Sequence, residues 1–375
     1  MHRRQMRPNP TIKYQIVIFG CQMNASDAER LAAVFDKLKF KKTDNINQAD
    51  IIAVVMCSVR QSAVDRVHFL AHKFKKIKAK TILTGCILEK DRKKFAENFD
   101  YIIDIKDIGN LPKILARQQI FSRRGVGSPE REDAPQEKTW LPSKYNVPIM
   151  TGCNNFCSYC VVPYTRGREI SRPAKEIICE VKKLVENSCK EIWLLGQNVN
   201  SYSCKIPISK SQFPKKSRII NFPKLLKMID SIPGNFELNF TSSHPKDFSD
   251  ELINVMAKCR HFSKRLNLPI QSGDDEILKK MNRPYTVAQY KNLVKKIRKA
   301  IPDISLSTDV IVGFPGETKK QFENTVKTFK EIGFDLAFIN KYSPRPGTQA
   351  AKLKDDVPWQ EKKRREKILI DLVNK

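Results

Sequence analysis

Segments typical of buried strands alternate with segments typical of amphipathic helices, and this alternation restricts the folds open to the chain. Four strands are predicted near the N-terminus, over residues 14–19, 50–56, 80–84 and 100–104. Helices are predicted among them over residues 30–38, 61–74 and 89–98, the first behind a capping-box pattern at Ser26 and Glu29. Strands that alternate with helices need crossover connections, which predicts a parallel sheet with helices on both faces.

The same alternation returns in the second part of the chain. Between residues 117 and 143, Gly, Pro, Arg, Glu and Gln dominate, which predicts a linker. Six further strands are predicted over residues 147–150, 191–195, 236–240, 265–268, 305–312 and 335–340, and helices over 175–185, 250–258, 285–299 and 318–332. A polar stretch over residues 205–217 is predicted to be an exposed loop. Six strand–helix units are fewer than the eight of a closed barrel, so this barrel is predicted to be open on one side.

The predicted architecture is therefore an α/β protein with two domains. A Rossmann- or flavodoxin-like parallel sheet is expected over residues 12–116, and an open (βα)6 barrel over residues 144–365. A length of 375 residues is consistent with this division. No apolar run approaches the ~20 residues of a membrane-spanning helix, and the basic N-terminus has no cleavage site of a signal peptide. We therefore expect no membrane association and a cytoplasmic location.

The net charge indicates the kind of binding partner, and the cysteine content indicates the cellular compartment. The formal net charge is +29, with Lys and Arg spread along the chain, which favours a polyanion such as a nucleic acid as partner. Ten cysteines at irregular spacing do not resemble a disulfide scaffold. Their spacing is more consistent with a protein of a reducing compartment whose cysteines bind metal or take part in redox chemistry.

The strongest local motif is the stretch CNNFCSYC, which contains Cys153, Cys157 and Cys160. It is predicted to be a loop directly after a strand. Three thiolates on so short a loop can hold one cubic iron–sulfur cluster and leave its fourth iron without a protein ligand. S-adenosylmethionine can bind such an open iron, and an electron from the cluster can then cleave the sulfonium to a radical. A zinc site is the alternative, but it would need a fourth Cys or His nearby.

A second set of cysteines is scattered in sequence but equivalent in position. Cys21, Cys57 and Cys86 each follow a predicted strand and precede a predicted helix. The carboxyl ends of parallel strands meet at one edge of the sheet, so the three thiols are predicted to converge there. The alternative for each is a small buried side chain. The remaining cysteines share no spacing and are predicted to be structural or incidental: Cys179, Cys189, Cys204 and Cys259.

Polar residues also follow several strands of the predicted barrel, at the end where a barrel places its active site. Candidates for binding S-adenosylmethionine or the substrate are Gln197, Asn198, Ser243, Gln271, Ser272 and Asp309. Candidates for binding phosphate, directly after the cysteine loop, are Arg166, Arg168 and Arg172. Turns, caps and exposed basic loops are the alternative roles. No side-chain nucleophile is predicted beyond the cysteine ligands.

With these residues the chain resembles the MiaB-type tRNA methylthiotransferases of the radical SAM superfamily. Besides the cysteine loop, the matching stretches are GCQMN at residues 20–24, LLGQNVNSY at 194–202, TSSHP at 241–245, LPIQSG at 268–273, MNRPY at 281–285, STDVIVGFPGET at 307–318 and YSPRPGT at 342–348. The sequences QMN at residues 22–24, PYT at 163–165 and QNVN at 197–200 favour the branch of the family that acts on isopentenyladenosine. The sequence differs from the family pattern at Asn267, where a histidine is expected, so no family role is assigned to that residue.

The resemblance implies two 4Fe-4S clusters and S-adenosyl-L-methionine as cofactors. Cys153, Cys157 and Cys160 would hold the cluster that binds S-adenosylmethionine, and Cys21, Cys57 and Cys86 an auxiliary cluster that donates sulfur. The reaction would abstract hydrogen from carbon 2 of N6-isopentenyl(dimethylallyl)adenosine, beside the anticodon of tRNA, and place a methylthio group there. A flavodoxin- or ferredoxin-like electron donor and a sulfur donor would be required.

Two alternative functions remain open, and one domain of the family is not expected in this chain. The alternatives are a methylthiotransferase acting on threonylcarbamoyl adenosine and a non-catalytic, metal-stapled RNA-binding protein. Members of the family usually end in a small β-rich RNA-binding domain of the TRAM type, which is expected to be absent between the barrel and Lys375.

Overall fold

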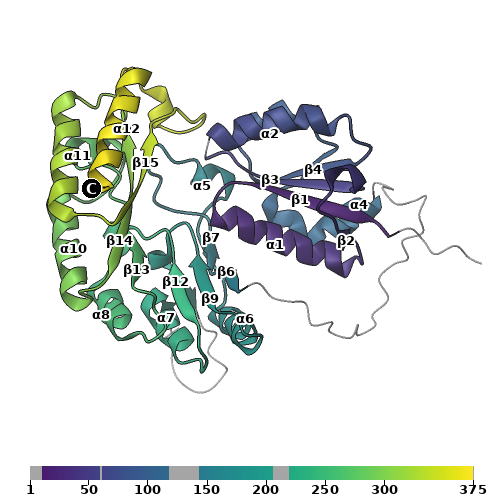
Figure 1. Cartoon of the computed structure of the whole chain (residues 1–375), viewed down its shortest axis with the longest axis horizontal. Helices are drawn as coiled ribbons and strands as arrows, with labels where there is room; N and C mark the ends of the chain where they lie inside the picture. Colours follow the sequence, from purple (N-terminus) through teal and green to yellow (C-terminus); the bar gives the residue numbers. More distant parts are fainter. Residues whose placement is uncertain (1–10, 60, 118–142, 206–218, 375) are drawn as a thin grey trace, which may run out of the picture. The chain divides into compact units, whose positions relative to one another are not determined.

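The computed structural model describes residues 11–59, 61–117, 143–205 and 219–374. These residues form two compact units, which divide between residues 140 and 141. Most of the predicted linker (residues 118–142) and most of the predicted loop (residues 206–217) lie outside the described residues. Each unit is therefore described by itself (Figure 1).

The first unit contains a parallel sheet of five strands in the order β2-β1-β3-β4-β5. The three long strands are β1 (Lys13–Phe19), β3 (Ile51–Cys57) and β4 (Lys80–Cys86), and the two short ones are β2 (Lys41–Lys42) and β5 (Tyr101–Ile102). This is the strand order of flavodoxin-like folds, in which the chain reverses its direction of winding between β1 and β3. The prediction of a parallel flavodoxin-like sheet is confirmed.

Helices cover both faces of this sheet (Figure 1). On one face α1 (Gln22–Lys37) and α4 (Leu111–Arg117) pack against Ile51, Ala53 and Val55 of β3. On the other face α2 (Gln61–Phe74) and α3 (Glu89–Phe95) pack against Ile52, Val54 and Met56. All seven residues of β3 are buried, because this strand lies at the centre of the sheet between two cores.

The predicted start of the first helix is wrong. Helix α1 begins at Gln22, directly after Cys21, so Ser26 and Glu29 lie inside the helix instead of capping it. Cys21 is the N-cap residue, and Oδ1 of Asn24 accepts a hydrogen bond from its backbone N–H at 3.4 Å. Cysteine is an uncommon cap residue, and the Ser26–Glu29 pair matched the usual pattern, so the sequence pattern indicated the wrong position.

The second unit contains six parallel strands in two sheets of three. The first sheet has the order β12-β9-β6 and the second β13-β14-β15, and a single parallel bridge between Leu238 and Phe262 links them. Their bounds are β6 (Lys144–Pro148), β9 (Glu191–Leu195), β12 (Glu237–Phe240), β13 (Arg265–Asn267), β14 (Ser305–Val312) and β15 (Leu336–Lys341). In the described residues β15 does not pair with β6, so the barrel is open, as predicted.

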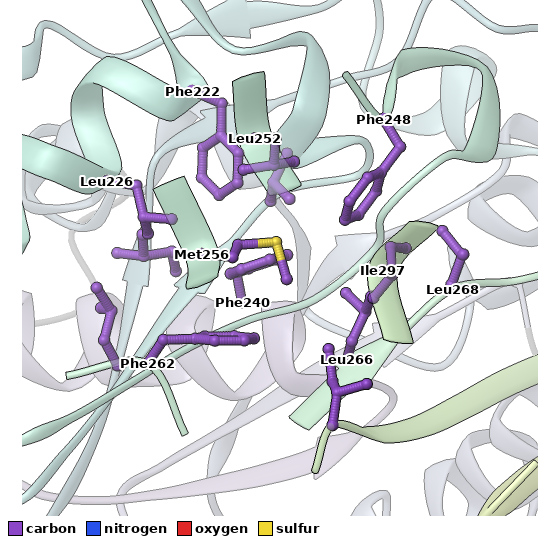
Figure 2. Packing of buried hydrophobic residues seen from close by; sticks show 14 of the residues in the cluster. Phe222, Leu226, Phe240, Phe248, Leu252, Met256, Phe262, Leu266, Leu268 and Ile297 are labelled. Atoms are coloured by element: carbon purple, nitrogen blue, oxygen red, sulfur yellow. The ribbon is translucent and has the colours of Figure 1, made fainter. Parts of the chain in front are cut away.

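The helices of this unit pack on the outer side of the strands. Their bounds are α6 (Ala174–Glu186), α7 (Phe222–Asp230), α8 (Asp250–Lys258), α9 (Asp275–Lys280), α10 (Val287–Ala300), α11 (Lys319–Ile332) and α12 (Trp359–Val373). Between α7, α8 and the strands, Phe222, Phe240 and Met256 point toward one another (Figure 2). On β15 exposed and half-buried residues alternate, and Leu336 and Phe338 are 50% and 47% exposed.

Several smaller elements of this unit were not predicted. They are α5 (Val162–Thr165), α7, α9, a hairpin of β7 (Met150–Thr151) with β8 (Ile170–Ser171), and a hairpin of β10 (Ser203–Lys205) with β11 (Ile219–Asn221). The predicted helix 285–299 begins two residues later, at Val287, because Thr286 caps it. Among the helices of the described residues, none has the length and apolar character of a membrane span.

A buried ion pair attaches α12 to the loop after β14. Arg365 donates from NH1 to Oε2 of Glu317 at 2.7 Å, and the N–H of Gly313 donates to the same oxygen at 2.6 Å. The two side chains are only 5% and 1% exposed. Burial raises the pKa of Glu317, although the Gly313 hydrogen bond and the Arg365 charge oppose the rise. The carboxylate therefore depends on its cationic partner.

We predict that Arg365→Ala lowers the free energy of unfolding by about 3–5 kcal/mol, because it leaves a buried carboxylate without its cation. Urea denaturation of the full chain measures this loss. Arg364→Ala is the matched control, since Arg364 is half exposed on the same helix and its ion pair with Glu361 contributes at most about 1 kcal/mol. Equal losses in the two variants would contradict the assignment.

Candidate active site

The cysteine loop of the second unit lies between β7 and α5. Cys153 is buried, and Cys157 and Cys160 are partly exposed. Burial, followed by the charge of Cys157, raises the pKa of Cys160 to about 12, and Cys153 contributes in the same direction. Burial also raises the pKa of Cys153, again with a contribution from Cys157. The three thiols are therefore close enough to act on one another electrostatically, and a bound cation would favour their thiolate forms.

A segment more than 120 residues away in sequence holds this loop. Ser158 donates its N–H to the carbonyl oxygen of Met281 at 3.0 Å and its hydroxyl to that of Lys280 at 2.8 Å. The Nδ2 of Asn282 donates to the carbonyl oxygens of Asn155 and Phe156 at 3.2 and 3.0 Å. We call residues 280–283 the loop clasp. The sequence motif MNRPY marked this segment, but it did not show that the segment contacts the cysteines.

The three cysteines of the first unit converge at the carboxyl edge of its sheet. Cys57 and Cys86 are the last residues of β3 and β4 and lie opposite each other in the register, and Cys21 follows β1. The Cys57 thiol interacts with the thiols of both Cys21 and Cys86. The hydrogen bond with Cys57, followed by burial, raises the pKa of Cys21. The strands β1 and β3 flank the point at which the winding reverses, where open α/β sheets bind ligands.

Two glycines allow these strand ends to approach. A Cβ on Gly85 would lie 2.2 Å from the carbonyl oxygen of Met56, and the φ of Gly85 is +113°. A Cβ on Gly20 would lie 2.9 Å from the Cβ of Cys57. Each glycine directly precedes one of the cysteines, so a side chain at either position would displace a thiol.

Asn24 links two of the three strand ends. Its side chain is fully buried, its Oδ1 accepts from the Cys21 thiol at 3.3 Å, and its Nδ2 donates to the Met56 carbonyl oxygen at 3.0 Å. In the described part of the chain, no three His, Cys, Asp or Glu side chains are arranged to hold a single metal ion. A cubic cluster is larger than one ion, so its thiolate ligands stand farther apart. As donor groups, the three thiols of each unit suit such a cluster.

Buried polar atoms without a partner gather after β9 and β12, which are neighbouring strands of the barrel. In these two loops of the described structure, the unpaired atoms are Gln197 Oε1, Asn198 Oδ1, Asn200 Nδ2, Ser243 Oγ and His244 Nε2. Burial, followed by the charge of Arg283, lowers the pKa of His244 to about 2, so its imidazole is neutral. Buried polar groups are normally paired, so this group of atoms fits a polar ligand. Gln197, Asn198 and Ser243 were predicted from sequence, whereas Asn200 and His244 were not among the site residues.

The other predicted ligand-binding residues have more varied positions. Asp309 lies inside β14, not at its end, and its Oδ2 accepts from Asn267 Nδ2 at 3.1 Å. Gln271 extends the same sheet through a parallel bridge to Val310, and its N–H donates to the Asp309 carbonyl oxygen. Its φ of +68° lies in the left-handed region. Ser272 is buried and accepts the N–H of Asp274 at 3.3 Å, as in a turn before α9.

The three arginines after the cysteine loop differ in exposure. Arg166 is buried. Arg172 donates to the Pro148 carbonyl oxygen at 2.6 Å and to Glu180 at 2.8 Å, so it is engaged within the chain. Arg168 is exposed, and its guanidinium lies 4.4 Å from the ring centroid of Phe156 in the cysteine loop.

The four remaining cysteines lie away from both cysteine sets in sequence and on different elements. Cys179 lies on α6 and is exposed, and Cys189 is buried before β9. Cys259 ends α8 and donates to Asp230 Oδ1 at 3.2 Å, and Cys204 lies in the β10–β11 hairpin.

Comparison with known proteins agrees with this division into two units. Residues 147–329 match the model of the radical SAM superfamily, and residues 13–105 match the uncharacterized protein family UPF0004. A tRNA-2-methylthio-N(6)-dimethylallyladenosine synthase from Clostridium novyi is 42% identical over 96% of this chain and 81% of its own length. The protein of the same name from Carboxydothermus hydrogenoformans is 39% identical over 96% of this chain and 83% of its length.

The chain belongs to the family of these tRNA methylthio-dimethylallyladenosine synthases. It is therefore a radical SAM enzyme, and that superfamily implies one 4Fe-4S cluster and S-adenosylmethionine. These relatives do not favour the threonylcarbamoyl adenosine enzyme or the non-catalytic RNA-binding protein. Among solved structures, the radical S-adenosylmethionine methyltransferase TsrM from Kitasatospora setae has a TM-score of 0.64 and 14% identity, covering 91% of this chain and 77% of that one. That likeness concerns the fold.

If Cys21, Cys57 and Cys86 hold iron, we predict that Asn24→Ala reduces the iron content of the first unit. The change leaves the Met56 carbonyl and the Cys21 N–H without their partner, at a cost of about 1–3 kcal/mol. After anaerobic reconstitution, total iron should fall towards the roughly four atoms of a single cluster. Asn98→Ala, a change at a partly exposed asparagine of the same unit, is the control and should keep its iron. Full iron content in Asn24→Ala would refute the prediction.

Proposed function

We propose that this chain converts N6-isopentenyl(dimethylallyl)adenosine beside the anticodon of tRNA into its 2-methylthio derivative. The observation that carries the proposal is the presence of two separate sets of three thiols, one in each unit. A radical enzyme that only cleaves S-adenosylmethionine needs one such set, whereas insertion of sulfur also needs a sulfur source. The names of the relatives supply the substrate.

The division of labour follows from the positions of the thiols. Residues 12–116 would form the methylthiotransferase domain, with Cys21, Cys57 and Cys86 as ligands of an auxiliary 4Fe-4S cluster. Residues 144–365 would form the radical SAM core, with Cys153, Cys157 and Cys160 as ligands of the first cluster, and residues 117–143 would link the two domains. When bound, the first cluster supplies the electron that cleaves S-adenosylmethionine, and the auxiliary cluster supplies sulfur.

Side chains of the barrel would bind and orient the organic ligands. Gln197, Asn198 and Ser243 present their unpaired buried atoms at the carboxyl ends of β9 and β12, where a barrel places its active site. A polar ligand such as S-adenosylmethionine would pair these atoms and remove the cost of leaving them unpaired. The Asn267–Asp309 pair and Gln271 would line the same ligand site from the neighbouring sheet of β13 and β14.

The positive charge of the chain would attract the phosphates of the tRNA. A net charge of +29 favours binding of tRNA phosphates. Of the three arginines after the cysteine loop, Arg168 is the best placed for a phosphate, since Arg166 is buried and Arg172 pairs with Glu180. An electron donor of the flavodoxin or ferredoxin kind and a sulfur donor would complete the reaction, in the cytoplasm.

The substrate is tested by nucleoside mass spectrometry of tRNA from a strain that lacks the gene. Loss of 2-methylthio-isopentenyladenosine, with accumulation of isopentenyladenosine, is the expected result. Loss of the 2-methylthio derivative of threonylcarbamoyl adenosine instead would overturn the proposed substrate and leave the radical SAM assignment intact.

We predict that the two cysteine sets separate cleavage of S-adenosylmethionine from transfer of sulfur. The full chain should bind about eight irons, and either triple Cys→Ala variant about four. The variant at residues 21, 57 and 86 should still form deoxyadenosine but no methylthio product, while the variant at residues 153, 157 and 160 should form neither. Methylthio product from the first of these variants would rule out the auxiliary cluster.

A further inference from the structure

The loop clasp places a positive charge directly against a cysteine of the radical SAM loop. The NH1 group of Arg283 donates to the Cys157 sulfur at 3.6 Å, within the range of N–H···S hydrogen bonds. The guanidinium is fixed by two other bonds, from NH2 to the Pro269 carbonyl oxygen and from Nε to the Tyr285 hydroxyl, both at 2.9 Å. Its planar fork therefore has one orientation, which points a donor at the sulfur.

Arg283 is only 6% exposed, and its surroundings contain no carboxylate partner among the described residues. The groups near it that can carry negative charge are Tyr159, Tyr285 and Cys157. Tyrosine is neutral at physiological pH, and burial raises the pKa of both tyrosines further. A buried cation without a counter-ion costs several kcal/mol, so the natural counter-ion of Arg283 is an anionic centre that includes the Cys157 thiolate.

We propose that Arg283 is a positioning residue for the cluster held by Cys153, Cys157 and Cys160, and that its buried charge raises the reduction potential of that cluster. The inference rests on the proposed assignment of these three cysteines as ligands. Reduction adds one negative charge to the cluster. A fixed positive charge in a medium of low dielectric constant stabilises the reduced form more than the oxidised form. Hydrogen bonds to ligand sulfurs and nearby charge are among the factors that set such potentials.

The other contacts of the clasp provide an internal comparison. Asn282 holds the same loop through the carbonyl oxygens of Asn155 and Phe156 but carries no charge. If the clasp only shaped the loop, changes at Asn282 and Arg283 would have the same kind of effect. If Arg283 acts through its charge, only its replacement changes the potential.

The test uses the full chain with Cys21, Cys57 and Cys86 replaced by Ala, so that one cluster remains. In this background Arg283→Gln, Arg283→Met, Arg283→Lys and Asn282→Ala are compared by anaerobic redox titration without S-adenosylmethionine, followed by the electron paramagnetic resonance of the reduced cluster. Iron content is measured on each sample. The Met variant is included because an apolar side chain suits a buried site better than an amide does.

We expect a more negative midpoint potential in the Gln and Met variants, a smaller negative shift in the Lys variant, which retains the charge, and an unchanged potential in Asn282→Ala. An unchanged potential in a Gln or Met variant that holds about four irons would overturn the inference. Loss of iron from both, with iron retained in Asn282→Ala, would give Arg283 a structural role alone and would also overturn it. If the parent itself does not bind about four irons, the cysteine assignment fails instead.

Discussion

The parallel direction of the strands is the constraint on which the cysteine site of the first unit and the polar site of the barrel depend. In each unit the strands enter at one edge and end at the other, so loops that are distant in sequence begin from neighbouring points. In the first unit this brings Cys21, Cys57 and Cys86 together from three strand ends. In the second unit the same geometry places the unpaired polar atoms after β9 and β12 side by side. An antiparallel sheet would send alternate loops to opposite edges.

The thiols of both sites lie in surroundings that disfavour their ionised forms. Burial raises the pKa of Cys153 and Cys160, and contact with Cys57 raises that of Cys21. Metal ligation requires thiolates, so binding of a metal by these thiols would have to offset this cost. Exposure differs within each set, because Cys57, Cys86 and Cys153 are buried, Cys157 and Cys160 are partly exposed, and Cys21 is exposed.

Much of the fold could be predicted because the chain follows regular local rules. Helices α2 and α8 and strands β9 and β14 have the predicted bounds, since their apolar periodicity and flanking polar residues agree. The start of α1 could not be predicted, because its cap depends on a cysteine and on a buried asparagine that reaches another strand.

The positions of the site residues were partly accessible from the sequence. The strand-end placement of the cysteines follows from the alternation of elements. The engagement of Arg172 with Glu180 and the contact of Arg283 with Cys157 depend on tertiary packing between segments that share no sequence pattern. The same holds for the unpaired atoms of Asn200 and His244, because a polar residue in a loop does not show in advance which of its atoms will lack a partner.

Within the part of the chain that the structure describes, β15 pairs with β14 alone and forms the edge of its sheet. A closed barrel has no edge strand, whereas an open barrel keeps one whose backbone groups on one side lack a strand partner. Leu336 and Phe338 are exposed on that strand, so this edge of the sheet presents apolar side chains. Any contact that covers these two side chains would remove apolar surface from water and would be stabilised by that burial.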